Sequence, residues 1–251
     1  MSAVPRVGFE SGLRSGHQRD VPRLGPLAMA LLLVLLSGCA SLPPVHDRPV
    51  TFALAPSREA PLARAILPVA GQHPGKTGIV AIDDGRVSLG VRLALVRDAA
   101  RSVDIQTFIW HADSAGTLLY EAVLRAAERG VRVRLLLDDL NMQGLDPLFA
   151  LLASNPNLEL RLYNPFVGRG SRAVGFLGDF TRLNRRMHNK SFTVDGVVTV
   201  VGGRNLADEY FETGKELGLV DLDVVAVARR SPTSRRNSTC SGTARRRTPR
   251  G

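Results

Sequence analysis

Strand-like and helix-like segments alternate along the middle of this chain, and the alternation limits the possible folds more than any other feature. Apolar residues recur at helical spacing in three segments, residues 87–100, 116–129 and 145–153. Runs typical of strands lie between and after them, at residues 103–110, 131–137 and 158–163. Strands separated by helices predict βαβ units, so we expect an α/β domain with a mixed, mainly parallel sheet flanked by helices.

The pattern changes after residue 163. Residues 164–186 are rich in Gly and Arg and are predicted to form a loop. Residues 187–194 and 197–201 then look like two strands joined by Asp195-Gly196, a dipeptide typical of hairpin turns. A last strand is expected over residues 221–228.

An apolar run precedes this domain. Residues 27–38 are too few to cross a bilayer as a helix, but they have the length of a signal-peptide core. The run Leu36-Ser37-Gly38-Cys39 resembles the lipobox of bacterial lipoproteins, in which the cysteine is acylated. An ordinary secretory signal and an interfacial helix remain alternatives. The lipoprotein resemblance, with Ala40 after the cysteine, implies a lipid-anchored protein of the bacterial envelope that faces the periplasm, with the outer membrane favoured.

Composition divides the chain into four parts. We expect a signal peptide with lipobox over residues 1–39, a Pro- and Gly-rich tether over 40–78, a folded domain over 79–228 and a disordered basic tail over 229–251. The tail has no core pattern, and a frameshift near Ala228 would explain this, because high-GC codons read in another frame can encode an amphipathic helix.

The formal charge of +10 lies at the ends of the chain. Residues 229–251 contain eight arginines and no acid, and residues 1–39 contain four arginines and two acids. The segment between them is therefore close to neutral, which disfavours nucleic acid as the partner. Cys39 and Cys240 lie in the terminal parts with no histidine cluster near them, so we expect neither a structural disulfide nor a metal site, and no cofactor.

The residues most informative about chemistry are His188 and Lys190. Two residues apart on a strand, they face the same side and bring an imidazole and an ammonium together. A neutral imidazole can attack phosphorus while the ammonium neutralises the phosphate oxygens. Backbone amides at Gly202-Gly203 and the side chain of Asn205 could complete a cradle for phosphate.

The spacing of these residues resembles a family signature. Met187 to Asp195 reads Met-His-Asn-Lys-Ser-Phe-Thr-Val-Asp, and Gly202-Gly203-Arg204-Asn205 follows after six residues. This is similar to HxKx4Dx6G(S/G)xN, the HKD motif of the phospholipase D superfamily. The segments 106–111, 129–139 and 204–211 extend the resemblance to the bacterial cardiolipin synthase branch.

That resemblance implies roles for individual residues. His188 would be the nucleophile or the acid for the leaving group, and Lys190, Gly203 and Asn205 would bind phosphate. For Asp195, a catalytic role and a structural role are both open. An acidic residue on a later strand would orient the histidine, with Asp221 as the candidate.

Asp223, on the same strand, is the alternative to Asp221. Phe108 and Trp110 alternate on their predicted strand, and core packing is the interpretation for Phe108. Gly203 stands where other superfamily members have serine, so a hydroxyl contact to phosphate is missing.

The resemblance implies phosphatidyl transfer, or phosphodiester hydrolysis, on a phospholipid such as phosphatidylglycerol through a phosphohistidine. Members of the family join two such motifs in one site, and this sequence shows one. A truncated enzyme is therefore the leading interpretation. A homodimeric phosphodiesterase or nuclease and an inactive lipoprotein are the alternatives.

Overall fold

The computed structural model describes residues 25–26, 28, 50–167, 172–213 and 218–227 of the 251-residue chain. The chain separates into two units, residues 1–40 and residues 41–251, and the description below concerns the second. The predicted signal peptide with Cys39 at its lipobox, and the predicted basic tail, lie outside these described ranges apart from residues 25, 26 and 28. Within the described ranges, no helix combines the length and the hydrophobicity needed to cross a bilayer.

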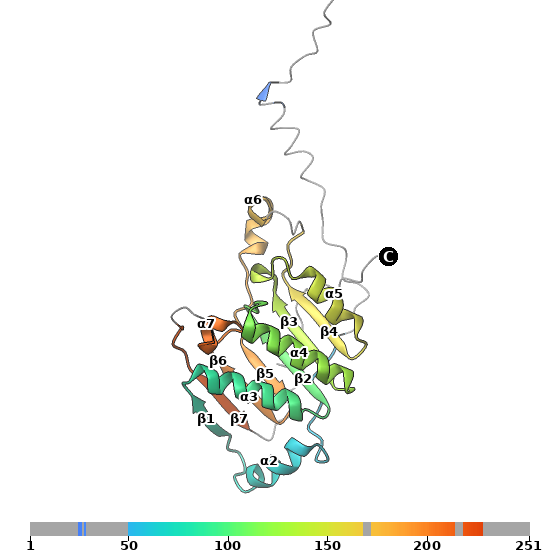
Figure 1. Ribbon diagram of the computed structural model, residues 1–251, viewed down its shortest axis with the longest axis vertical. Helices are drawn as coiled ribbons and strands as arrows, with labels where there is room; N and C mark the ends of the chain where they lie inside the picture. Colours follow the sequence, from blue (N-terminus) through green and yellow to red (C-terminus); the bar gives the residue numbers. More distant parts are fainter. Residues whose placement is uncertain (1–24, 27, 29–49, 168–171, 214–217, 228–251) are drawn as a thin grey trace, which may run out of the picture. The chain divides into compact units, whose positions relative to one another are not determined.

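One sheet organises the described residues (Figure 1). Its strands follow the order β1-β7-β6-β5-β2-β3-β4. Their bounds are Gly78–Ile82 (β1), Ser102–Thr107 (β2), Arg132–Asp138 (β3), Leu158–Tyr163 (β4), Ser191–Val194 (β5), Val198–Gly202 (β6) and Asp223–Val227 (β7). Strands β2, β3 and β4 are parallel, and every other neighbouring pair is antiparallel.

The expected mixed α/β sheet is thus confirmed, but the prediction that it would be mainly parallel is wrong. The difference lies in the part of the sheet that contains the predicted turn at Asp195-Gly196 and the strands that pair around it. Both residues have positive φ, 50° and 66°, as a two-residue hairpin turn requires, so β6 returns antiparallel to β5. Strand β7 pairs with β6, and β1 pairs with β7, in the same antiparallel sense.

Helices cover the sheet. Their bounds are Pro61–Gly71 (α2), Gly85–Asp98 (α3), Ser114–Glu128 (α4), Asp146–Ser154 (α5), Arg172–Leu183 (α6) and Asp208–Phe211 (α7). The helices expected from periodicity correspond to α3, α4 and α5, with ends within two residues. Asp84 and Asp113 begin α3 and α4 because their carboxylates accept the backbone N–H groups of Val87 and Gly116.

The core lies between the sheet and the helices α3 and α4, which run side by side across one face (Figure 1). Alternate residues of the central strands point into it, and they are fully buried because every second side chain faces the helices. The strand residues of this core include Val103, Ile105, Val133, Leu135 and Leu137.

Two helices depart from the expectations. Residues 61–71, which the composition placed in a tether, form α2, whose Ala63 packs on Val197 and Val198. Helix α6 lies in the predicted Gly- and Arg-rich loop. Its apolar residues Phe176, Phe180 and Leu183 recur at helical spacing, and helix forms despite the glycine content. The helix is broken at Asp179, whose φ of -149° and ψ of 46° are not helical.

Candidate active site

The motif residues His188 and Lys190 lie in extended chain that leads into β5, which begins at Ser191, later than the sequence predicts. The two side chains occupy the same side of the chain, as their spacing predicts. Lys190 Nζ is 3.2 Å from Nε2 and 3.4 Å from Nδ1 of His188. His188 is exposed and Lys190 is half-buried, so a solvent-borne phosphate ester can reach both groups.

The buried carboxylate of Asp138 fixes the position of this pair. Strand β3 ends at Asp138, which accepts the backbone N–H of Met187 at 2.7 Å and the Arg186 guanidinium at 3.0 Å. Burial raises the pKa of Asp138, and these donors act in the opposite direction. On the other side of the motif, Asn189 donates to Gln106 at 3.0 Å.

An aromatic ring forms one wall of the site. The centroid of the Phe108 ring lies 4.9 Å from that of His188 and 5.7 Å from Lys190 Nζ. Core packing was therefore the wrong interpretation for Phe108, because β2 ends at Thr107 and the next residue leaves the sheet. Trp110 is the core residue: it is fully buried and stacks on Tyr120.

Asn205 is buried, and its side chain has defined partners. Its Oδ1 accepts the backbone N–H of Ile109 at 3.1 Å, and its side chain also hydrogen-bonds the Tyr210 phenol. Burial raises the pKa of Tyr210, while the bond from Asn205 opposes this rise. Asn205 thus joins the end of β2 to the half-buried Tyr210, and a phosphate contact for it remains a proposal.

The Gly202-Gly203 turn allows a close approach between chain segments. A Cβ at Gly203 would overlap the Asp221 carboxylate, and a Cβ at Gly202 would overlap the backbone of Leu222 and Asp223. The backbone N–H of Gly203, expected to bind phosphate, instead donates to the Leu222 carbonyl at 3.2 Å. A side chain at position 203 would require the Asp221 carboxylate to move.

The negative charge of Asp221 interacts with the ammonium group of Lys190. Partial burial lowers the pKa of Lys190, and the negative charge of Asp221 acts in the opposite direction and favours the ammonium form. The Asp221 carboxylate also accepts the backbone N–H of Leu222 at 2.7 Å. Asp221 thus acts on the site through its charge, which also raises the pKa of Tyr210.

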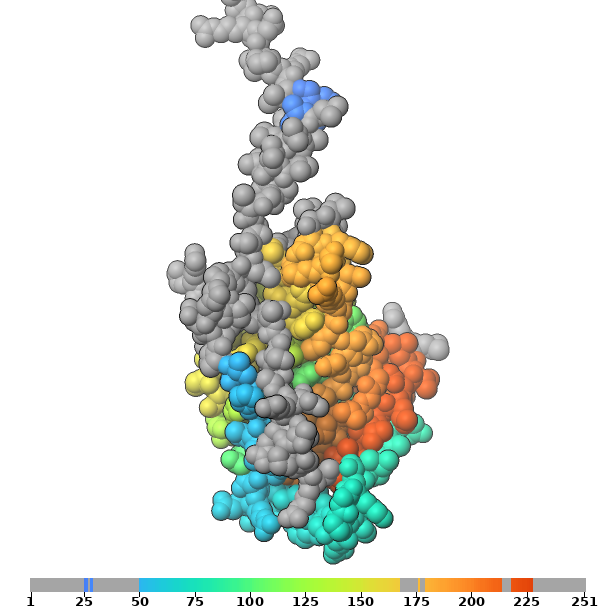
Figure 2. All heavy atoms as spheres, turned by 180° about the vertical axis from the view of Figure 1, so that it is seen from behind, coloured from blue at the N-terminus to red at the C-terminus, as the bar shows by residue number. Residues whose placement is uncertain are grey.

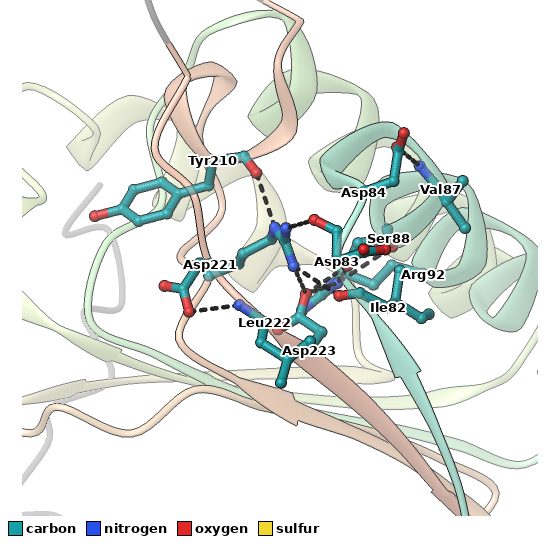
Figure 3. Close-up of polar contacts among 11 residues, drawn as sticks. Ile82, Asp83, Asp84, Val87, Ser88, Arg92, Tyr210, Asp221, Leu222 and Asp223 are labelled. Carbon is teal, nitrogen blue, oxygen red and sulfur yellow. Dashed lines mark hydrogen bonds and ion pairs between the residues drawn. The ribbon is translucent and has the colours of Figure 1, made fainter.

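Asp223 has a different environment (Figure 3). It is fully buried, pairs with Arg92 at 3.0 Å and Arg204 at 3.5 Å, and accepts the Ser88 hydroxyl. In Figure 3 Asp223 points into this cluster, whereas Asp221 lies outside it on the side of Tyr210. Asp223 therefore belongs to this buried network, and none of its hydrogen bonds or ion pairs among the described residues reaches His188.

Asp195 lies at the opposite end of β5 from His188. Its buried carboxylate accepts three backbone N–H groups, from Ala100 at 3.1 Å, Arg101 at 2.8 Å and Ser102 at 2.9 Å. The sequence left a catalytic and a structural role open for Asp195. These contacts support the structural role, because they join the hairpin turn to the start of β2.

Sequence reasoning missed Asp138, Phe108 and Tyr210 as parts of this site. Asp138 had a signal, because it is a carboxylate at the end of a predicted strand. Phe108 and Tyr210 lie in the segments 106–111 and 204–211 that extend the family resemblance, but the sequence could not show that pairing between distant segments brings them to the motif. Within the described ranges, no three His, Cys, Asp or Glu side chains form a group that could hold a metal ion.

Comparison with known proteins agrees with this arrangement. A family model described as "Cardiolipin synthase, PLD-like domain" matches residues 93–230, more than half of the chain. The chain belongs to the phospholipase D-like family. Its resemblance to the cardiolipin synthase branch, suggested by the motif, is thereby confirmed.

Relatives in this family are longer than the present chain. Cardiolipin synthase C of Escherichia coli K12 is 53% identical over 166 residues, which are 66% of this chain and 35% of that protein. An uncharacterized protein of Helicobacter pylori strain 26695 is 33% identical over 210 residues, 78% of this chain and 41% of that protein. Cardiolipin synthase B of E. coli K12 is 30% identical over 118 residues, 47% and 27% of the two chains. The matched segment thus spans less than half the length of these relatives.

Proposed function

We propose that this domain supplies the nucleophilic half of a site that cleaves or transfers phosphodiesters of phospholipids. The observation that supports the proposal best is the His188–Lys190 pair, with Nζ 3.2 Å from the imidazole, in a domain of the phospholipase D-like family. A phosphodiester bound beside this pair would meet a nucleophile and a positive charge at once.

In the proposed reaction, an imidazole nitrogen of His188 attacks phosphorus and forms an N–P bond. The bond between phosphorus and the leaving alkoxide breaks, and an acid protonates the alkoxide. A second alcohol, or water, then attacks phosphorus and breaks the N–P bond, so His188 is regenerated. Lys190 stabilises the phosphate oxygens throughout, and the negative charge of Asp221 favours the ammonium form of that lysine.

The acid that protonates the leaving group is a second imidazole in the proposed scheme. In the described part of the chain, His188 is the histidine that lies at this site. A second copy of the chain could bring another His188 to the same phosphate, which is the homodimer that the sequence left open.

The names of the relatives favour a lipid substrate and a lipid alcohol as acceptor, as in cardiolipin synthesis from phosphatidylglycerol. Water as acceptor would give hydrolysis by the same residues. An acylated Cys39 would hold the domain at the periplasmic side of the outer membrane, close to such substrates.

Release of labelled headgroup from phosphatidylglycerol vesicles tests the proposal. The wild-type chain should release or transfer label, and His188→Ala should abolish this. His73→Ala is the matched control, because His73 is an exposed histidine that follows α2 and should leave the rate unchanged. Equal rates for wild type and His188→Ala would contradict the proposed role.

A further inference from the structure

Three phenylalanines form a ladder of rings that leads from the interior of the protein to its surface. Phe166 is 2% exposed and meets Phe176 edge-on, with 5.4 Å between the ring centroids. Phe176 is half-buried, and its ring centroid lies 6.4 Å from that of Phe180. Phe180, on α6, is 61% exposed, which is unusual for so large an apolar side chain. We call these residues the aromatic ladder.

Arginines surround the base of the aromatic ladder. The Arg186 guanidinium lies 5.7 Å from the Phe166 ring centroid, and Arg182 donates to the Pro165 carbonyl at 3.1 Å. Arg185 is exposed, and among the described side chains no carboxylate forms an ion pair with it. The backbone bonds from Asn184 to the Phe180 carbonyl at 2.8 Å and from Arg185 to the Arg182 carbonyl at 3.0 Å fold this segment into tight turns. An exposed aromatic ring and a cation available to an external anion therefore belong to the same short segment of the chain.

Within the described domain, α6 and α2 lie at opposite ends (Figure 1). Figure 2 shows the same from behind: the light orange atoms of this region are at one end and the blue-to-cyan atoms of α2 are at the other. The helix is also close to the catalytic motif in sequence. Arg186 and Met187, both bonded to Asp138, directly precede His188. The aromatic ladder is thus connected to the motif through a fixed segment.

We propose that the C-terminal part of α6, after the break at Asp179, docks on an anionic lipid surface. Phe180 enters the interfacial region of the bilayer, where aromatic side chains are favoured, and Arg185 contacts negatively charged headgroups. A lipid bilayer can deform around a single exposed ring and a nearby cation. A protein partner would instead need a broad complementary surface patch. This contact is separate from the predicted anchor at Cys39, and it does not depend on the reaction proposed above.

Fluorescence quenching in the full chain tests the contact at Phe180 itself. The chain has one tryptophan, Trp110, which is fully buried and sets the baseline in the wild type. Vesicles of brominated phosphatidylcholine and phosphatidylglycerol should strongly quench the added emission of Phe180→Trp. Val69→Trp is the matched control, because Val69 is 59% exposed on α2, at the other end of the molecule, and should not be quenched.

Equal quenching of the two tryptophan variants, or quenching of neither, would overturn the docking proposal.

Two further variants test the parts played by the ring and by the cation. Phe180→Ser should reduce the rate of headgroup release from vesicles about tenfold, because the free energy of burying one phenylalanine in the bilayer is lost. The rate of cleavage of a soluble phosphodiester should remain unchanged. Arg185→Gln should reduce quenching of Trp at position 180 on vesicles that contain phosphatidylglycerol, but not on neutral vesicles. Because quenching requires no turnover, an inactive chain that is quenched would keep the docking proposal and contradict only the proposed function.

Discussion

At the scale of single residues, the two aspartates predicted to assist catalysis have different tasks. Asp195 bonds three backbone amides far from His188, whereas Asp221 acts on Lys190 through its charge. Substitutions by asparagine keep the volume and remove the charge, so they separate these tasks.

Asp195→Asn should lower the free energy of unfolding by about 2–3 kcal/mol, because an amide group cannot accept all three N–H groups and its own NH2 faces one of them. Urea denaturation measures this change. The rate per folded molecule should remain close to that of wild type. A stable variant that has lost its activity would instead assign Asp195 to the chemistry.

Asp221→Asn should move the alkaline limb of the pH–activity profile to lower pH. Burial already lowers the pKa of Lys190, and the Asp221 charge opposes this effect. Without that charge the pKa falls further, so the ammonium form is lost at a lower pH. A profile of kcat/KM against pH measures the shift, and an unchanged or upward-shifted alkaline limb would show that Asp221 does not act on Lys190.

The limits of prediction at this scale are clear from Gly203 and Asn205. The spacing of the motif predicted that His188 and Lys190 face the same side. It could not predict that the Gly203 amide bonds Leu222, or that Asn205 bonds Ile109 and Tyr210, because these contacts depend on how separate strands meet.

At the scale of elements, the site depends on the junction of β7, α3 and the turn before α7. Asp223, at the start of β7, pairs with Arg92 of α3 and with Arg204 beside the Gly202-Gly203 turn. Burial lowers the pKa of Arg92, and Asp223 opposes this. Arg204 extends the junction by donating to the carbonyls of Ile82 and Tyr210.

Asp223→Asn should therefore destabilise the fold by about 3–5 kcal/mol, since it leaves two buried arginines without their counter-charge. The melting temperature of this variant, compared with that of Asp221→Asn, measures the effect. Similar melting temperatures for the two variants would mean that the buried network contributes little to the junction.

Element prediction succeeded where periodicity was strong. Helices α3, α4 and α5 and the first strands have long segments with one clear period. Helix α6 was hidden by glycines and arginines, and α2 by prolines, including Pro68 inside the helix. The hairpin at Asp195-Gly196 was predicted correctly. The antiparallel pairing of β5 with β2, of β7 with β6 and of β1 with β7 was not, because it depends on which distant strands become neighbours in the sheet.

At the scale of the whole molecule, the described domain brings one nucleophile, one ammonium and one supporting carboxylate to the same place. The proposed reaction also needs an acid for the leaving group. A substrate whose leaving group is stable as an anion removes that requirement, so it tests His188 independently of any second copy or second motif.

The most direct measurement is mass spectrometry of the chain after brief reaction with bis(p-nitrophenyl) phosphate, quenched in alkali because the N–P bond is labile to acid. The proposed function predicts a nitrophenylphosphoryl adduct on His188 that is absent from His188→Ala and present in His73→Ala. Nitrophenolate release without such an adduct, or an adduct on another residue, would contradict His188 as the nucleophile.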